Sequence, residues 1–205
     1  LVEKGRGLGG RMATRRMEGA RIDHGAQFFT VRDSRMEELL SLWVAEKAVV
    51  PWYDHIPGLP DLPRGQRYRG TEGMTSPAKV LAKEFSVETN LFVDRITRDG
   101  QKWLISEREG EGRQLQADHL VMTIPSVQLL ELFERSDYSL DEDTMNSIRS
   151  IRHTRCLAVL GIMDRPSSFK HPGTLTHPIP DIDWISDNQV KGISAEPSCI
   201  IHASD

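Results

Sequence analysis

The chain has 205 residues, of which 38% are hydrophobic and 27% are charged, and its formal net charge is -4. This is the composition of an ordinary soluble globular protein, and the acidic balance argues against nucleic acid as a general partner. No apolar run approaches the roughly 18 residues of a membrane helix and no signal peptide is visible, so we expect no membrane contact. Cys156 and Cys199 lie in apolar contexts without metal-ligand spacing, which predicts buried thiols, no metal site and a reducing, cytoplasmic location.

The first half of the chain alternates between strand-like and helix-like patterns. Residues 1–3 have the pattern of the end of a buried strand, and residues 20–31 predict one or two strands broken at Gly25. Residues 34–50 predict a helix capped by Ser34, with an apolar face made of Met36, Leu39, Leu40, Trp43 and Val44. Residues 51–72 predict loops and short strands, and a second helix follows with Thr75 or Ser76 as its cap and Pro77 in its first turn.

The second half is richer in strands. Residues 90–125 predict a hairpin that turns at residues 98–101, then a solvated polar loop at residues 107–113, then a buried strand at residues 119–125. Helices are expected at residues 126–135 and 140–151, the second capped near Asp141. Strands are expected at residues 154–164, 183–188 and 198–204, with a proline-rich connection at residues 166–182.

This order of elements predicts an α/β fold in which a nucleotide-binding half is interleaved with a half built on a mixed sheet. We expect the first domain to comprise residues 1–48 and 73–150, and the second to comprise residues 49–72 and 151–205. The sequence does not begin with Met and opens within an apolar run, so we expect a fragment of a longer protein.

The glycine-rich stretch near the start has the chemistry of a dinucleotide site. In a nucleotide-binding βαβ unit an acidic residue ends the second strand and accepts hydrogen bonds from the adenosine ribose, and Glu3 is placed for that role. Arg6 and Arg11 can donate to a pyrophosphate, while Gly9 and Gly10 allow the backbone to approach the cofactor closely. The carboxylate would repel a 2′-phosphate, which favours FAD or NAD over NADP.

The spacing Glu-x-x-Arg-x-x-Gly-Gly-Arg after a strand resembles the second signature of the flavin-containing amine oxidase superfamily. Within it, "EKGRGLGGRMATRR…DHGAQFF", "RYRGTEGMTSPAKVLA", "DHLVMTIPSVQ" and "DIDWISDN" most resemble the renalase-like NAD(P)H oxidases. The resemblance covers essentially the whole chain. It implies a Rossmann-like FAD-binding domain whose first βα unit, with the Gly-x-Gly-x-x-Gly turn, lies upstream of this sequence.

The resemblance also implies roles for particular residues. Glu3 would bind the ribose, Arg6 and Arg11 would lie along the pyrophosphate, and Gly9 and Gly10 would approach the cofactor. The other residues that it places near the cofactor are Gly25, Ala26 and Gln27 beside the isoalloxazine, Val93 at the adenine, and Thr123 and Pro125 near the adenosine and pyrophosphate. The residues that it places on the substrate side are Phe28, Trp184, Asn188 and His202.

Several of these residues also have ordinary structural interpretations. Phe28 and Phe29 suit a core as well as an aromatic cage, and Trp184 suits packing as well as pocket lining. Trp52, Tyr53 and His55 could contact substrate from the loop-rich insertion. Asp23 and His24 are adjacent on a strand and point to opposite faces, so they cannot act together on one atom.

No nucleophile motif, zinc motif or phosphate-binding loop is present, so a cofactor must supply the chemistry. The resemblance implies an FAD-dependent oxidase that takes hydride from dihydronicotinamide dinucleotide isomers and passes electrons to O2, giving NAD(P)+ and H2O2. A flavin-containing amine oxidase or desaturase shares the same cofactor site and remains open. A dinucleotide-binding module without turnover is the third hypothesis.

Overall fold

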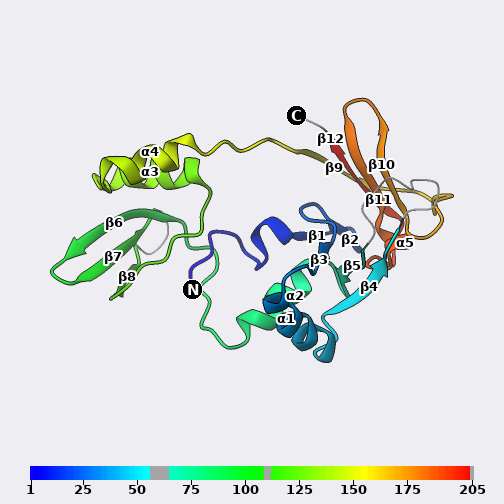
Figure 1. The fold of residues 1–205 in the computed structure, drawn as a ribbon, viewed down its shortest axis with the longest axis horizontal. Coiled ribbons are helices and arrows are strands. Elements are labelled where there is room, and N and C mark those ends of the chain that lie inside the picture. The colour runs from blue at the N-terminus through cyan, green and yellow to red at the C-terminus, as the bar shows by residue number, and fades with distance from the viewer. Residues whose placement is uncertain (56–64, 109–111, 204–205) are drawn as a thin grey trace. The chain divides into compact units, whose positions relative to one another are not determined.

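The structure is a computed structural model that describes residues 1–55, 65–108 and 112–203. The chain forms two compact units, and each is assembled from two separate stretches of sequence (Figure 1). The first unit comprises Leu1–Gly7 and Val87–Thr154, and the second comprises Leu8–Ser86 and Arg155–Asp205. These boundaries differ from those of the two expected domains, whose division remains a prediction. Within the described ranges, no helix has both the length and the apolar character that crossing a membrane requires.

The first unit is a three-stranded antiparallel sheet with two helices packed on it. The strand order is β6-β7-β8. The elements are β6 (Val93–Asp99), β7 (Lys102–Glu107), β8 (Gln114–Ala117), α3 (Ser126–Ser136) and α4 (Glu142–Ser150). The predicted hairpin turn is confirmed: Asp99 pairs with Lys102, and Gly100 between them has a φ of 59°. Glycine adopts this left-handed conformation without steric cost.

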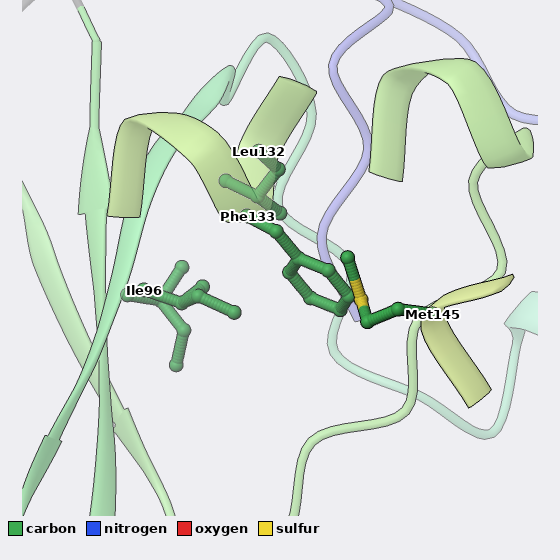
Figure 2. Close-up of a cluster of buried hydrophobic side chains, with 5 residues drawn as sticks. Ile96, Leu132, Phe133 and Met145 are labelled. Atoms are coloured by element: carbon green, nitrogen blue, oxygen red, sulfur yellow. The ribbon is translucent and has the colours of Figure 1, made fainter. Parts of the chain in front are cut away.

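The core of the first unit forms where α3 packs against β6 and α4 packs against α3. Figure 2 shows Ile96, Leu132, Phe133 and Met145 gathered between the sheet and the helices. Both helices are confirmed at the predicted places. Asp141 caps α4, because its side chain accepts a hydrogen bond from the amide of Thr144.

Two strand predictions in the first unit are wrong. Residues 119–125 form no strand, and the third strand is β8, which precedes them. Leu120 and Met122 pack on the core while Val121 is 85% exposed. The strand-like apolar pattern of this segment therefore reflects alternate burial of its side chains and not pairing in a sheet. Residues 1–3 are not a buried strand either: Val2 forms one parallel bridge with Glu88 and is 43% exposed.

The described residues of the second unit form three antiparallel sheets. A hairpin joins β1 (Thr14–Met17) to β2 (Ala20–Asp23), and a three-stranded sheet has the order β3-β5-β4. The four-stranded sheet has the order β10-β11-β12-β9. The remaining strand bounds are β3 (Phe29–Thr30), β4 (Val49–Tyr53), β5 (Arg67–Gly70), β9 (Leu157–Ile162), β10 (Thr174–Ile179), β11 (Ile182–Asp187) and β12 (Ser198–Ala203).

The helices of the second unit are short, and their bounds are η1 (Gly10–Met12), α1 (Ser34–Ala45), α2 (Thr75–Ala82) and α5 (Asn188–Lys191). The cap of α1 is Asp33 rather than Ser34, because the Asp33 carboxylate accepts from the amide of Arg35. Met74 rather than Thr75 precedes α2, although Pro77 lies in its first turn as predicted.

Three further expectations are corrected in the second unit. The proline-rich connection contains strand β10, which tolerates Pro178 because it lies at the edge of its sheet. Val44 is 49% exposed and does not belong to the buried apolar face of α1, on which Trp43 lies. Cys156 is an exposed free thiol, whereas Cys199 is half-buried.

Two small cores hold the second unit together. Ala20 and Ile22 of β2 pack against Ile200 of β12, which joins the hairpin to the four-stranded sheet. Trp43 of α1 packs with Ala48 and Val49 at the start of β4. The predicted site residues of this unit lie at η1, in the segment that follows β2, on β11, at the start of α5 and on β12.

Candidate cofactor and substrate site

In the first unit, Glu3 stands where the glycine-rich loop begins. Its amide donates to the carbonyl of Glu88 at 2.8 Å, and its carbonyl accepts from Leu91 at 3.2 Å. Its carboxylate oxygen Oε1 accepts from the amide of Gly5 at 2.7 Å. The carboxylate is therefore held against the backbone at the start of the loop.

The glycine pair of the predicted cofactor loop adopts conformations that other residues rarely tolerate. Gly9 has a φ of 119° and Gly10 has a φ of 49°. A Cβ on Gly9 would lie 2.8 Å from Cγ2 of Thr75, whereas nothing lies within 4 Å of a Cβ built on Gly10. Gly9 is required by packing, and the backbone at Gly10 is open to an approaching ligand.

The structure brings two of the predicted cofactor segments together within the second unit. The carbonyl of Arg11 accepts from the amide of Ala26 at 2.8 Å, and the carbonyl of Ala13 accepts from His24 at 3.2 Å. A Cβ on Gly25 would lie 2.0 Å from the Arg11 carbonyl oxygen, so only glycine fits there. Residues 25–27, called here the flavin-side segment, thus lie directly against the glycine turn. Arg11 itself is exposed, as is Arg6 in the first unit.

Asp23 precedes the flavin-side segment and is completely buried. Its Oδ1 accepts from the hydroxyl of Thr14 at 2.6 Å and from the amide of Met74 at 2.8 Å. Its Oδ2 accepts from the ammonium of Lys191 at 2.8 Å. The carboxylate therefore joins β1, the start of α2 and the end of α5.

Lys191 is the residue of this site that sequence reasoning missed. Its side chain is fully buried, and its Nζ donates to Asp23 Oδ2 and, at 3.2 Å, to Gln27 Oε1. Burial lowers the pKa of Lys191, with Arg69 acting in the same direction and Asp23 opposing it. The sequence signal is weak: a lysine between apolar Val190 and Ile193 looks like an ordinary solvated helix end.

Four aromatic residues, Phe28, Trp52, Tyr53 and Trp184, form a cluster that we call the aromatic cluster. The ring centroids of Phe28 and Trp184 lie 5.8 Å apart, and those of Trp52 and Tyr53 lie 4.8 Å apart. Phe28 also contacts Trp52 and Tyr53 at 6.5 Å and 6.2 Å. The structure therefore unites the predicted substrate residues Phe28 and Trp184 with two aromatic residues of the loop-rich insertion. Phe29, by contrast, packs on Trp43 in the core.

Two cations of the chain lie over the faces of the aromatic cluster. The guanidinium carbon of Arg67 lies 5.4 Å from the Phe28 centroid and 5.0 Å from that of Tyr53. The Nζ of Lys191 lies 4.8 Å from the Trp52 centroid. These are distances for cation–π attraction. Burial raises the pKa of the Tyr53 phenol, and the charge of Arg67 opposes that shift.

A cavity of about 420 Å³ borders the aromatic cluster. Its described lining consists of Pro51, Trp52, Tyr53, Asp54, His55, Gln66, His171 and Pro172. Another cavity, of about 480 Å³, is lined by Arg67 and Tyr68 and by residues around Thr30. We associate the first cavity with a substrate because aromatic side chains line it.

Trp184 and His202 are direct partners in the β11–β12 ladder and lie on the same face of the sheet. In the described part of the chain, neither Trp184 Nε1 nor His202 Nε2 has a hydrogen-bond partner, although both atoms are buried. Burial lowers the pKa of His202, which favours its neutral form. These two atoms are therefore available to a bound polar group.

Asn188, also predicted on the substrate side, is completely buried. Its Oδ1 accepts from the amide of Asp23 at 3.4 Å, and its Nδ2 donates to the carbonyl of Ser198 at 3.4 Å. Both polar groups of its side chain are thus used within the protein. Its observed contacts connect β2 with β12.

The remaining predicted cofactor residues belong to the first unit. Val93 begins β6, is half-buried and pairs with Glu107. Thr123 is exposed, and Pro125 immediately precedes α3 and accepts a hydrogen bond from Leu129. Val93 and Pro125 thus lie at the start of an element, and Thr123 lies in the segment before α3.

Comparison with known proteins defines the class of the chain. Residues 59–192 match the family model for flavin containing amine oxidoreductases, and residues 1–43 match the model for NAD(P)-binding Rossmann-like domains. Since the first match covers more than half of the sequence, the chain belongs to the flavin containing amine oxidoreductase family. Family membership makes it an oxidoreductase and makes its cofactor a flavin, FAD.

Solved structures share the fold at low sequence identity. Wild-type putrescine oxidase bound to putrescine matches with a TM-score of 0.66 at 13% identity, over 100% of this chain and 69% of that one. A CLA-producing fatty acid isomerase from P. acnes matches with a TM-score of 0.65 at 11% identity, over 99% of this chain and 70% of that one. At such identities the likeness shows the fold alone.

The residues present fit a flavin dinucleotide. In the second unit, the open backbone at Gly10 and the two left-handed glycines permit close approach of a ligand. In the first unit, considered by itself, Glu3 supplies a carboxylate next to a parallel bridge. The flavin-side segment is held against the glycine turn by backbone hydrogen bonds. The chain therefore offers both polar groups for a dinucleotide and a rigid backbone edge for a planar ring.

Proposed function

We propose that the protein is an FAD-dependent oxidase of dihydronicotinamide dinucleotides, similar to the renalase-like enzymes. The overall reaction would be NAD(P)H isomer + O2 + H+ → NAD(P)+ + H2O2. Bound FAD would supply the redox chemistry, by accepting hydride at N5 and returning two electrons to O2. The residues proposed to bind it are Glu3, Arg6, Gly9, Gly10, Arg11, Gly25, Ala26, Gln27, Val93, Thr123 and Pro125.

The observation that carries this proposal is the positive charge at the aromatic cluster. Arg67 and Lys191 lie over its rings, so the aromatic faces that would attract an amine cation are already occupied by cations. The carboxylate of Asp23 is fully engaged by Thr14, Met74 and Lys191. A protonated amine would meet repulsion there, whereas a dinucleotide carries a negatively charged pyrophosphate.

The chain's own residues would bind and orient the donor. Hydride transfer from a dihydronicotinamide needs no dedicated acid or base, only a donor carbon held about 3–3.5 Å from the acceptor. Phe28 and Trp184 would pack against the planar ring. Trp184 Nε1 can donate to a carboxamide oxygen, and neutral His202 can accept from a carboxamide N–H. The buried cluster would also keep water away from the reacting atoms.

Oxidation of an amine is the second candidate, and family membership favours it. The family model describes amine oxidoreductases, and the fold is shared with a putrescine oxidase. The two candidates share a cofactor and differ in the charge that their pockets must accept. A dinucleotide-binding module without turnover is the third possibility.

Anaerobic reduction of the bound flavin separates these candidates. The full-length protein, purified with FAD, is mixed without O2 with 2- and 6-dihydro isomers of NAD(P), or with putrescine and a monoamine. We expect rapid bleaching of the visible flavin absorption with the dinucleotides alone and, after O2 is admitted, equal amounts of NAD(P)+ and H2O2. Bleaching by amines alone would establish the second candidate, and bound FAD that no compound bleaches would favour the third.

A reducing compartment such as the cytoplasm is part of the same proposal. Cys156 and Cys199 are both free thiols, and Cys156 is exposed. An exposed free thiol is typical of proteins kept in a reducing environment. Localising the tagged full-length protein by microscopy or fractionation would test this part.

A further inference from the structure

The buried pair of Asp23 and Lys191 lies between the flavin-side segment and the aromatic cluster. Lys191 Nζ is 2.8 Å from Asp23 Oδ2, 3.2 Å from Gln27 Oε1 and 4.8 Å from the Trp52 centroid. Both charged side chains are entirely inaccessible to solvent. One ammonium thus contacts Asp23, two positions before the segment, the last residue of the segment and a residue of the aromatic cluster.

Gln27 is held in one orientation by this arrangement. Its Nε2 donates to the carbonyls of Asp23 and Gly25, at 2.5 Å and 3.2 Å, so its Oε1 must face the ammonium of Lys191. Gln27 is 6% exposed, and its side-chain amide forms hydrogen bonds within the protein. It therefore folds back over residues 23–25 and closes the segment into a fixed loop.

Stability alone gives a weak account of such a pair. Removing two charges from water is costly, and apolar residues of similar volume often replace a buried ion pair at no loss of stability. Asp23 already receives hydrogen bonds from Thr14 and Met74 without Lys191. Lys191 makes two further contributions: its charge balances Asp23 at Oδ2, and its ammonium donates to Gln27 Oε1. A buried acceptor at Gln27 without this donor would allow the loop to rearrange.

We propose that Lys191 is a positioning residue, which acts through Asp23 and Gln27 to hold the flavin-side segment in the conformation that contacts the isoalloxazine. This inference rests on the proposed role of residues 25–27 at the flavin. Lys191 need not touch the cofactor. Its contact with Trp52 also couples the segment to the aromatic cluster, so the cofactor side and the substrate side share one support.

The test uses the full-length protein loaded with FAD. Its variants distinguish the effect of removing the ion pair from the effect of removing the Gln27 amide. K191M alone would leave Asp23 as an unpaired buried carboxylate, so the informative variant is the double substitution D23N/K191M. Q27M removes only the amide and leaves the ion pair in place. R35M is the matched control, because Arg35 pairs with Asp33 on the surface with its side chain 89% exposed.

Each variant is measured by thermal unfolding, by the visible absorption spectrum of the bound flavin, by its midpoint potential in a dithionite titration, and by the rate of anaerobic reduction. We expect D23N/K191M and Q27M to unfold within about 5 °C of wild type, to shift the flavin spectrum and potential, and to slow reduction at least about 10-fold. R35M should match wild type in all four measurements.

A wild-type spectrum, potential and reduction rate in both D23N/K191M and Q27M would overturn the inference and leave the pair a purely structural one. The spectrum and the potential need no substrate, so they judge this inference even if amines, rather than dihydronicotinamides, reduce the flavin. In that case the proposed function fails and the positioning role stands. A full-length protein that binds no flavin would overturn both.

Discussion

The backbone carbonyl of Arg11 accepts a hydrogen bond from the amide of Ala26 at 2.8 Å. This bond joins the glycine turn of residues 9–11 to the flavin-side segment, two stretches that the sequence identifies separately as cofactor-binding. Because the two backbones touch, Gly25 has no space for a side chain. The geometry of one segment therefore depends on the other.

Substitution of Gly25 by Ala is expected to be severe. The added Cβ would lie 2.0 Å from the Arg11 carbonyl oxygen, and backbone atoms rather than a flexible side chain would have to move. We expect a loss of about 3 kcal/mol in the free energy of unfolding and weaker flavin binding, measured by urea denaturation and by flavin release. Gly7→Ala is the control, because nothing lies within 4 Å of its Cβ position. Equal stability of the two variants would contradict the observed contact.

Removal of the Arg67 charge should weaken binding of an anionic substrate. In Arg67→Met we expect the KM for the dihydronicotinamide dinucleotide to rise about 10-fold, with a smaller change in kcat, since a charge–charge attraction near a protein surface is worth on the order of 1–4 kcal/mol. The measurement is steady-state H2O2 production. Arg98→Met is the control variant, because Arg98 also lies over a ring, 4.9 Å from the centroid of Trp103, but is exposed and belongs to the first unit. A KM unchanged in Arg67→Met would remove the charge argument for the substrate.

Protonation of His202 should destabilise the second unit at mildly acidic pH. Burial lowers its folded-state pKa below 6.5, the hydrogen bond with the His24 backbone opposes this shift, and the charge of Lys191 adds to it. Above pH 6.5 both states are neutral and the stability is fully present. As the pH falls below 6.5, the unfolded chain takes up the proton first, so stability is lost until the folded-state pKa is passed.

Thermal unfolding between pH 5 and pH 8 measures this effect. We expect the wild-type Tm to fall with acidification more steeply than that of His202→Gln. His119→Gln, at an exposed position, should follow the wild-type curve. Parallel curves for wild type and His202→Gln would show that the imidazole does not contribute.

The core of the first unit offers a test of the fold that is independent of the flavin. Phe133 is 1% exposed and lies among Ile96, Leu132 and Met145 (Figure 2). Truncation in Phe133→Ala should cost about 3–5 kcal/mol of unfolding free energy, because it removes a buried ring and leaves a cavity. Val121→Ala, at a position 85% exposed, should cost less than about 0.5 kcal/mol by the same denaturation measurement. Similar losses would contradict the burial pattern.

Local signals predicted most of the elements. The turn chemistry at Gly100 and the periodicity of α3 and α4 specified those elements because neighbouring residues determine them. The predictions of strands failed where contacts with distant segments determine whether a strand forms. Residues 119–125 carry an apolar pattern that side-chain packing satisfies without a strand, and β10 pairs at a sheet edge despite Pro178.

For the candidate site, the sequence by itself determined the ingredients: an acidic residue followed by arginines and paired glycines, and a family resemblance consistent with a flavin dinucleotide. Those features are local, because they lie within a few residues of one another along the chain. Only the tertiary structure placed Lys191 beside Asp23 and Gln27, because these residues are more than 160 positions apart along the chain. The aromatic cluster with its two cations is likewise a product of folding, since no local pattern relates Trp52, Arg67 and Trp184.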